Sequence, residues 1–314
     1  MPGEFQIIRE HFRRKQRDAA LLVGIGDDGA VLRPREDHDL VVVTDTIVRG
    51  RHFPERFAAA DIGWRALAVN LSDIAAMGAA PRFAFLNLAL EEADDNWLRD
   101  FAGGFFSLAE QSGTLLAGGD TVRGPLSVTV TVIGEVARDA ACTRAGARAG
   151  DYVCVTGTPG DAAAGLELLQ AGADDEHPLV RRFRRPEPRL RAGRTLAGIA
   201  TAMIDVSDGL LADLGHVLEA SGAGARIEVS RLPVSAALAD HAEKPAEYVL
   251  AGGDDYELCF TVPEERLEAV KGLDCRVSII GRITAERGLR VLDANGREWR
   301  PERRGWDHFR NAHG

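Results

Sequence analysis

The chain has 314 residues, of which 45% are hydrophobic and 27% charged, a composition typical of an ordinary globular protein of roughly two domains. Its 38 lysines and arginines are outnumbered by 48 aspartates and glutamates, and the resulting net charge of −10 argues against a nucleic-acid-binding protein. The four cysteines lack C-x-x-C spacing, and neither a signal peptide nor an apolar run of about 18 residues is present, so we expect a cytoplasmic protein that does not bind membranes.

The first half of the chain alternates helical and strand-like patterns. Apolar residues at helical spacing predict a helix over 4–17, and a glycine-rich turn at 24–29 leads into a short strand at 30–32. The capping residues Asp61 and Gly78 bound a second predicted helix, and Asp94 opens a third that ends at Gly113. The strands predicted in this half are 40–44, 115–120 and 126–136.

Residues 138–151 form an aperiodic stretch rich in small residues and arginine, and we place the domain boundary there, giving domains 1–137 and 138–314. The basic segment 177–194 contains three prolines and is interpreted as an exposed connection and helix start. Further elements predicted in this half are strands 152–156, 202–204, 226–229, 256–262 and 276–280, helices 161–170, 208–220 and one from Pro263, and an Asn-Gly hairpin turn at 293–296. Both halves therefore predict an α/β fold.

Aspartates recur where strands end or glycine turns begin. They are Asp27, Asp28, Asp45, Asp73, Asp120, Asp205, Asp208, Asp254 and Asp255. Any one of them is more often a helix cap or turn residue. As a set, they lie among Gly, Ser, Thr and aliphatic residues at strand ends, where α/β folds collect ligands. Converging carboxylates repel one another unless cations are bound, and oxygen donors select hard ions such as Mg²⁺.

Magnesium held by carboxylates most often serves phosphate chemistry. The usual phosphate-binding loop is missing, because no G-x-x-x-x-G-K-[ST] motif occurs and no glycine is followed by lysine. The only lysines are Lys15, Lys244 and Lys271. Phosphoryl transfer by this chain would therefore depend on several magnesium ions rather than on a catalytic lysine.

A series of short motifs follows in a specific order along the chain. They are Gly24-Ile25-Gly26-Asp27-Asp28, Thr44-Asp45-Thr46, His52-Phe53, residues 68–78 with Asn70-Leu71-Ser72-Asp73, Gly118-Gly119-Asp120-Thr121, Asp205-Val206-Ser207-Asp208-Gly209-Leu210, Gly252-Gly253-Asp254-Asp255-Tyr256-Glu257-Leu258 and Trp306-Asp307-His308-Phe309. Each motif is weak alone, but the ordered set resembles the thiamine-monophosphate kinases, a family of the aminoimidazole-ribonucleotide-synthetase-like superfamily, over nearly the whole chain.

This resemblance implies a two-domain α/β fold in which the sheets of the N-terminal domains pair to form a homodimer and a C-terminal α/β domain completes the substrate site. It implies direct transfer of the ATP γ-phosphoryl group to thiamine monophosphate, giving thiamine diphosphate. The nucleophile would be a phosphate oxygen that is already ionised at neutral pH, so no general base is expected.

The resemblance also assigns roles to particular residues. The implied magnesium ligands are Asp28, Thr44, Asp45, Asp73, Asp120, Asp205 and Asp208. The implied contacts to ATP are Gly119, Asp120, Arg144 and Ser207, and those to the thiamine phosphate are His52, Asp254 and Trp306. The family often has Glu at the position of Asp254 and Tyr or Phe at that of Trp306. Without the resemblance, Arg144 would be read as a solvated loop residue, His52 as a strand-end histidine and Trp306 as a packing residue.

Two alternatives stay open. The chain could be another enzyme of the superfamily, an aminoimidazole ribonucleotide synthetase or a selenophosphate synthetase. The latter would require a reactive cysteine near the N-terminus, whereas the first cysteine here is Cys142. A scaffold protein with structural Ca²⁺ turns is a non-enzyme alternative, but no D-x-[DN]-x-[DN]-G loop with a downstream Glu occurs.

Overall fold

The computed structural model describes residues 4–14 and 18–302. The chain divides into two compact units, one comprising Met1–Ile74 and Ala79–Asp139, the other Ala75–Gly78 and Ala140–Gly314. Each unit contains a sheet with helices, as an α/β fold requires. Within the described residues, no helix combines the length and the apolar character needed to cross a bilayer.

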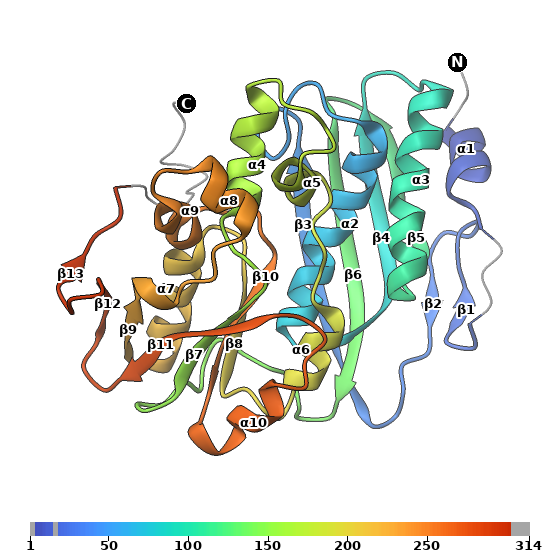
Figure 1. Ribbon diagram of the computed structural model, residues 1–314. Coiled ribbons are helices and arrows are strands. Elements are labelled where there is room, and N and C mark those ends of the chain that lie inside the picture. Colours follow the sequence, from blue (N-terminus) through green and yellow to red (C-terminus); the bar gives the residue numbers. More distant parts are fainter. Residues whose placement is uncertain (1–3, 15–17, 303–314) are drawn as a thin grey trace. The chain divides into compact units, whose positions relative to one another are not determined.

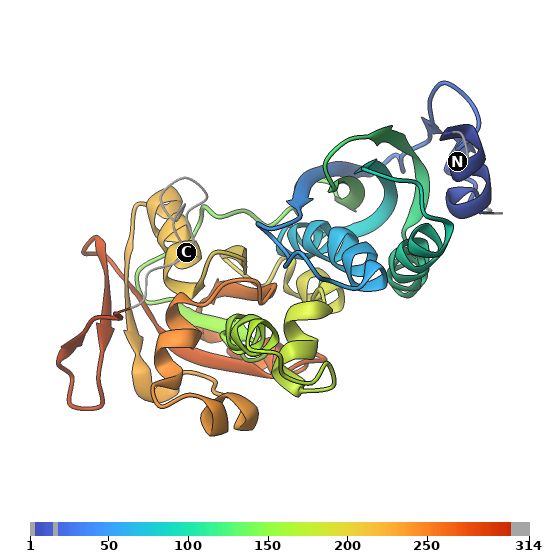
Figure 2. The same cartoon turned by 90° about the horizontal axis from the view of Figure 1, so that it is seen from above.

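The first unit is built on a four-stranded sheet with the order β3-β6-β4-β5. β6 is antiparallel to both of its neighbours, whereas β4 and β5 are parallel. Helices α2 and α3 cover one face of this sheet (Figures 1 and 2). The elements of this unit are α1 (Glu4–Ile7), η1 (Ile8–Phe12), β1 (Leu21–Val23), β2 (Val31–Leu32), β3 (His38–Val48), α2 (Ala59–Ala76), β4 (Ala80–Leu90), α3 (Asp95–Ser112), β5 (Leu115–Arg123) and β6 (Ser127–Ala137).

Alternation along β6 separates the two faces of the sheet. Val128, Val130 and Val132 are buried on the face that packs against the helices, as the period of two in a strand requires. Thr129 and Thr131 project from the opposite face, which we call the outer face. Threonine hydroxyls pair across the strands there, with Oγ1–Oγ1 distances of 3.0 Å for Thr44–Thr131 and 2.7 Å for Thr46–Thr129.

This unit differs from the sequence-based expectation at its first helix and at strand β4, among other places. The predicted helix over 4–17 ends at Phe12, where Arg13 adopts an extended conformation. Strand β4 was not predicted, although it lies inside the sheet between β6 and β5. Its second residue, Pro81, is a residue type that argues against an inner strand, and the register with β6 shifts between Pro81 and Phe83.

Helices α2 and α3 pack backbone to backbone at two glycines. A Cβ atom added to Gly104 would lie 1.7 Å from the Ala60 carbonyl oxygen, and one added to Gly63 would lie 2.1 Å from the Phe101 carbonyl oxygen. No side chain fits between backbones at this distance. The two glycines therefore set how closely the helices approach.

The second unit contains a seven-stranded sheet with the order β13-β12-β9-β11-β7-β10-β8. Its strands are β7 (Tyr152–Thr156), β8 (Ala202–Val206), β9 (Gly224–Glu228), β10 (Glu257–Val262), β11 (Val277–Thr284), β12 (Gly288–Leu292) and β13 (Glu298–Trp299). Its helices are α4 (Asp161–Gln170), α5 (Pro178–Arg184), α6 (Leu190–Leu196), α7 (Leu210–Ser221), η2 (Val229–Arg231), α8 (Ala236–His241), α9 (Pro245–Ala251), η3 (Glu264–Arg266) and α10 (Leu267–Val270). The predicted 293–296 turn is confirmed, since it joins β12 to β13.

Helices cover both faces of this sheet, which explains the continuous apolar runs of its inner strands. On β7, Val153 and Val155 join a core with residues of α4, α7, α8 and α9. Cys154, between them, joins a second core with residues of α6 and α10. Strands buried on both faces leave no exposed position for a polar side chain except at their ends.

An acidic side chain at one of these strand ends is fully buried. Glu257, at the start of β10, accepts hydrogen bonds from Arg189 Nε at 2.7 Å, from Arg182 Nη2 at 2.5 Å and from Thr156 Oγ1 at 2.6 Å. Burial by itself would raise the pKa of Glu257, but the hydrogen bonds and charge of Arg189, together with Arg182, outweigh it and lower the pKa. These arginines correct the sequence interpretation of 177–194, because α5 and part of α6 lie there and two of its charges are directed inward.

We expect Gly104→Ala to lower the free energy of unfolding by about 3 kcal/mol, because the added methyl group overlaps the Ala60 backbone. Gly103→Ala is the matched control, since Gly103 is exposed on the same helix and has no atom within 4 Å of an added Cβ. It should be neutral or stabilise by about 0.5–1 kcal/mol through helix propensity. Chemical denaturation measures both, and equal stability of the two variants would contradict the close approach.

Glu257→Gln should lower the free energy of unfolding by about 3–5 kcal/mol, because Arg182 and Arg189 then keep their charges in a buried site without the carboxylate. Glu187, which is 65% exposed and also pairs with these arginines, provides the control. Glu187→Gln should cost less than about 1 kcal/mol. Urea titrations at neutral pH distinguish the variants; a small effect of Glu257→Gln would show that the network is dispensable.

Candidate active site

In the first unit, the end of β3 is tied to helix α2. Thr44 and Asp45 are exposed on β3, and the Asp45 amide donates to Asn70 Oδ1 at 3.0 Å. Asn70 is fully buried in α2 and donates through Nδ2 to the Ala66 carbonyl at 3.0 Å. Asp73 follows Asn70 by three residues, one helical turn, and is half-buried. The Asn70 side chain thus brings the strand residue Asp45 next to the helix segment that carries Asp73.

Gly119 and Asp120 lie on β5, at the opposite edge of the same sheet from β3. Asp120 is exposed, and its Oδ1 accepts from the Thr121 amide at 2.8 Å. Gly119 has φ of 143°, and an added Cβ would lie 1.9 Å from the Leu86 carbonyl oxygen, so only glycine fits there. β6 and β4 separate β3 from β5, a backbone spacing of about 14 Å along the sheet.

Two further predicted residues of this unit lie outside the sheet. Asp28 is exposed in the loop between β1 and β2, where its amide donates to Asp27 Oδ1 at 2.9 Å. His52 is half-buried in the turn after β3, and its Nδ1 accepts from the Val48 amide at 3.1 Å. That bond closes the turn locally and directs one ring nitrogen toward the backbone.

In the second unit, the predicted residues gather on one turn at the end of β8. Asp205 is buried at the strand end, whereas Ser207 and Asp208 are half-buried in the turn that follows. Beneath this turn lies Asp213 of α7, whose Oδ2 accepts from the amides of Ser207, Asp208 and Gly209 at 3.0, 3.1 and 3.1 Å. Burial raises the pKa of Asp213 to about 7, and the charges of Asp205 and Asp208 act in the same direction.

Asp254 lies against this turn. Its amide donates to the Ser207 carbonyl at 2.8 Å, and its Oδ1 accepts from the Tyr256 hydroxyl at 3.2 Å. Asp254 and Tyr256 have φ of 68° and 55°, a left-handed conformation that is strained for residues other than glycine. The loop therefore adopts a conformation that its own sequence does not favour.

Asp255, between these two residues, anchors the loop. Its carboxylate accepts from the amides of Gly160 and Ala162, at the start of α4, at 2.6 and 3.0 Å. Burial raises the pKa of Asp255 well above its ordinary value, although the two amides and the Arg182 charge oppose the shift. The structure thus brings Asp205, Ser207, Asp208 and Asp254 together in the second unit.

Arg144 is not drawn into that group. Arg144 is exposed in the irregular segment after residue 139, where its carbonyl accepts from Ser221 Oγ at 3.2 Å. Trp306 lies outside the described residues.

Sequence reasoning gave no role to the residues that hold these loops, which are Asn70, Asp213 and Asp255. A signal existed for Asp213. It lies on the apolar stripe of α7 with Leu210, Leu214 and Val217, all buried. A carboxylate on the core face of a helix requires buried donors, and the nearest backbone donors are those of the turn before the helix.

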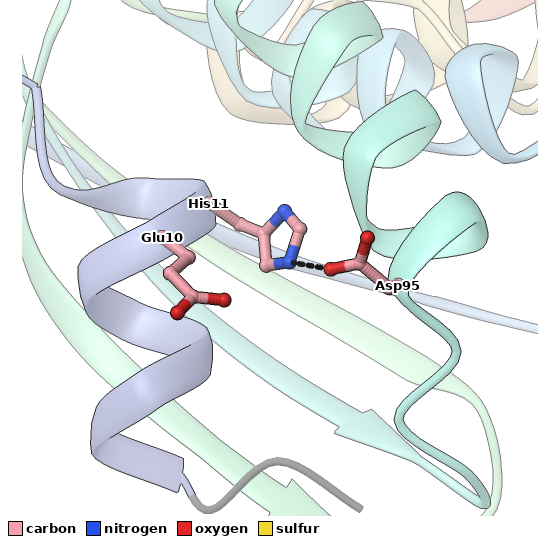
Figure 3. Close-up of side chains that lie close together, drawn as sticks. All are labelled: Glu10, His11 and Asp95. Atoms are coloured by element: carbon pink, nitrogen blue, oxygen red, sulfur yellow. Dashed lines mark hydrogen bonds and ion pairs between the residues drawn. The ribbon is translucent and has the colours of Figure 1, made fainter.

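Another group of possible ligand atoms is Glu10, His11 and Asp95, which lie within 4.8 Å of one another (Figure 3). His11 Nε2 and Asp95 Oδ1 are 3.0 Å apart, and Arg99 pairs with the other oxygen of Asp95 at 2.5 Å. Since Arg99 already neutralises Asp95, we interpret the group as an ion-pair contact that ties η1 to α3. None of the sequence-predicted ligands belongs to it.

Two family models match this chain. The AIR synthase related protein, N-terminal domain, matches residues 26–136, and the AIR synthase related protein, C-terminal domain, matches residues 148–294. The matched ranges contain Asp28, Asp45, Asp73, Asp120, Asp205, Asp208 and Asp254.

Relatives named thiamine-monophosphate kinase are similar to this chain along nearly its whole length. The kinase of Escherichia coli (strain K12) is 44% identical over 319 residues, which cover 98% of each chain. The solved thiamine-monophosphate kinase from Stenotrophomonas maltophilia K279a is 46% identical, with a TM-score of 0.83 over 87% of this chain and 91% of that one. The solved "AaThiL complexed with AMPPCP and TMP" is 35% identical, with a TM-score of 0.79 over 91% and 92% of the two chains. The resemblance drawn from the motifs is thereby confirmed: the chain belongs to the thiamine-monophosphate kinase family of the AIR synthase related proteins.

Proposed function

We propose that this chain transfers the γ-phosphoryl group of ATP to thiamine monophosphate, releasing thiamine diphosphate and ADP. The observation that carries this proposal is the 44% identity to a relative named thiamine-monophosphate kinase over 98% of both chains. A related structure that contains AMPPCP, an analogue of ATP, together with TMP supports the same pair of substrates.

The transfer is direct. A phosphate oxygen of thiamine monophosphate attacks the γ-phosphorus, a new P–O bond forms, and the bond to the β–γ bridging oxygen breaks in line with it. The attacking oxygen is already ionised at neutral pH, since the second pKa of a phosphate monoester is about 6. The chain then needs no general base, and its own residues bind, orient and balance charge.

The donors of the two units fit magnesium, because they are carboxylate and hydroxyl oxygens, and oxygen ligands select hard cations. The carboxylates of Asp205, Asp208 and Asp213 crowd one turn, a repulsion that a divalent cation relieves. When bound, magnesium neutralises the charge of the phosphate oxygens. The residues proposed to hold it are Asp28, Thr44, Asp45, Asp73, Asp120, Asp205 and Asp208.

The remaining predicted residues act on the organic substrates. Gly119, Asp120, Arg144 and Ser207 are proposed to contact ATP, with Arg144 pairing with phosphate oxygens. His52, Asp254 and Trp306 are proposed to contact thiamine monophosphate, with the Trp306 ring stacking on a flat heterocycle.

We also propose that the chain acts as a homodimer in the cytoplasm, with a second copy seated on the outer face of the first unit's sheet. Leu40, Val42 and Val122 on that face are 51%, 60% and 50% exposed, an apolar surface beside the paired threonines.

Purified protein with ATP, Mg²⁺ and thiamine monophosphate should form thiamine diphosphate, which chromatography detects. Asp73→Asn should reduce turnover roughly 100-fold, because it removes one negative ligand without changing the size of the side chain. Asp100→Asn, an exposed position on α3 outside the candidate site, should retain full activity and an unchanged melting temperature. Full activity of Asp73→Asn, or ATP consumed without diphosphate formation, would refute the proposal.

Sedimentation velocity should report about twice the chain mass of 33.8 kDa for the unmodified protein. Val42→Glu should shift the population toward monomers, because it places a charge in the apolar centre of the proposed interface. Ala220→Glu adds the same charge to an exposed position of α7 in the second unit and should leave the dimer intact. A monomer in all three samples would exclude this interface.

A further inference from the structure

The Asp213 side chain links a helix to the turn that precedes it. One oxygen, Oδ2, accepts from three consecutive amides, those of Ser207, Asp208 and Gly209, at 3.0–3.1 Å. The Asp213 amide also donates to the Gly209 carbonyl at 3.0 Å, which links the end of the turn to the first turn of α7. Three donors on one oxygen fix the orientation of three successive peptide planes.

This arrangement goes beyond ordinary capping of α7. A capping side chain satisfies amides of the first helical turn or of the residue that precedes it. Asp213 reaches further back, to Ser207, two residues before the N-cap Gly209. Gly209 itself has φ of 123° and ψ of 144°, far from helical values, so the turn has no helical geometry of its own to hold it.

The position is also costly for a carboxylate. Asp213 is 2% exposed and shares the core face of α7 with Leu210, Leu214 and Val217. An apolar residue there would bury its side chain without losing hydration. The carboxylate is explained by its hydrogen bonds to the turn, because Asp205, Ser207 and Asp208 all lie on the strand end and turn that it supports.

We propose that Asp213 is a positioning residue, which holds the 205–209 turn in the conformation that allows Asp205 and Asp208 to bind a divalent cation together with the nucleotide. This inference rests on the proposed function. Asp213 acts through the amides, since its Oδ2 accepts from three backbone donors of the turn. The turn is thereby formed before the ligands arrive, which lowers the entropic cost of binding them.

The test measures Mn²⁺ binding to the full chain by electron paramagnetic resonance, with and without AMPPCP, so that it does not depend on turnover. Asp213→Ala should weaken Mn²⁺ binding about tenfold or more. Asp213→Asn keeps an acceptor oxygen of the same size, so its affinity should fall between those of the unmodified protein and the alanine variant.

Asp151→Asn is the matched control for a buried carboxylate in the same unit. Asp151 is 4% exposed and accepts from the Arg148 amide at 2.9 Å and from Thr201 Oγ1 at 2.7 Å, at the opposite end of β7 from Thr156. Its removal should lower the melting temperature and leave Mn²⁺ affinity unchanged.

Wild-type Mn²⁺ affinity in a folded Asp213→Ala variant would overturn the positioning role, as would equal losses in Asp213→Ala and Asp151→Asn. If the unmodified protein binds Mn²⁺ and AMPPCP but forms no thiamine diphosphate, the proposed reaction fails. The role of Asp213 is still decided by the binding series in that case.

Discussion

Hydrogen bonding of buried carboxyl groups by donors of the chain itself is the constraint on which the second unit depends. Asp213 is held by three amides, Asp255 by two amides at the start of α4, and Glu257 by two arginines and a threonine. Each carboxylate would be too costly to bury without these partners. Asp255 and Glu257 tie together segments that are distant in sequence, and Asp213 ties α7 to the turn before it, so the same hydrogen bonds set the loop geometry.

These hydrogen bonds hold a loop with an unfavourable local conformation. Asp254 and Tyr256 adopt left-handed backbone angles, which persist only where surrounding contacts determine them. Asp255, buried between them, supplies such contacts by accepting hydrogen bonds from amides at the start of α4. The Tyr256 amide also donates a hydrogen bond to the Val206 carbonyl of β8. Ser207, Asp208 and Asp254, the residues proposed to contact the substrates and ions, lie half-buried on this loop and the neighbouring turn.

The first unit positions its candidate ligands through close backbone packing and a neutral side-chain amide. Gly63 and Gly104 let α2 and α3 touch, and Asn70 joins α2 to the end of β3 through a neutral amide. Its candidate ligands Asp28, Asp45 and Asp120 stay exposed, so no desolvation has to be balanced before ligands bind. The outer face of its sheet is left apolar and open, as a surface for a second copy would be.

Much of this could be predicted from the sequence, and the failures have physical reasons. The ordered motifs identified the family, and the strand patterns predicted β6, β7 and β10, because burial on one or both faces leaves a direct pattern. The β-branched run of 40–44 predicted β3 but indicated burial on both faces, whereas Leu40 and Val42 are exposed. Strand β4 was missed because Pro81 opens it, and α8 and α9 because helices of six or seven residues carry too little periodicity. The arginines of 177–194 were assigned to the surface because their partner, Glu257, lies 68 or more residues away in sequence. Asp255 was missed as an anchor because a carboxylate that accepts from amides has the same sequence signature as one that binds a ligand. Asp213 was missed although its position on the apolar stripe of α7 marked it as a buried carboxylate.

The central claim is that this chain balances charge and positions substrates while supplying neither a nucleophile nor a general base. The stereochemistry of transfer tests it most directly, using ATP made chiral at the γ-phosphorus with oxygen isotopes and thiamine monophosphate as acceptor. A single in-line displacement predicts inversion of configuration at the transferred phosphorus in thiamine diphosphate. Retention of configuration would require a phosphorylated residue of the chain as an intermediate, and would contradict the account.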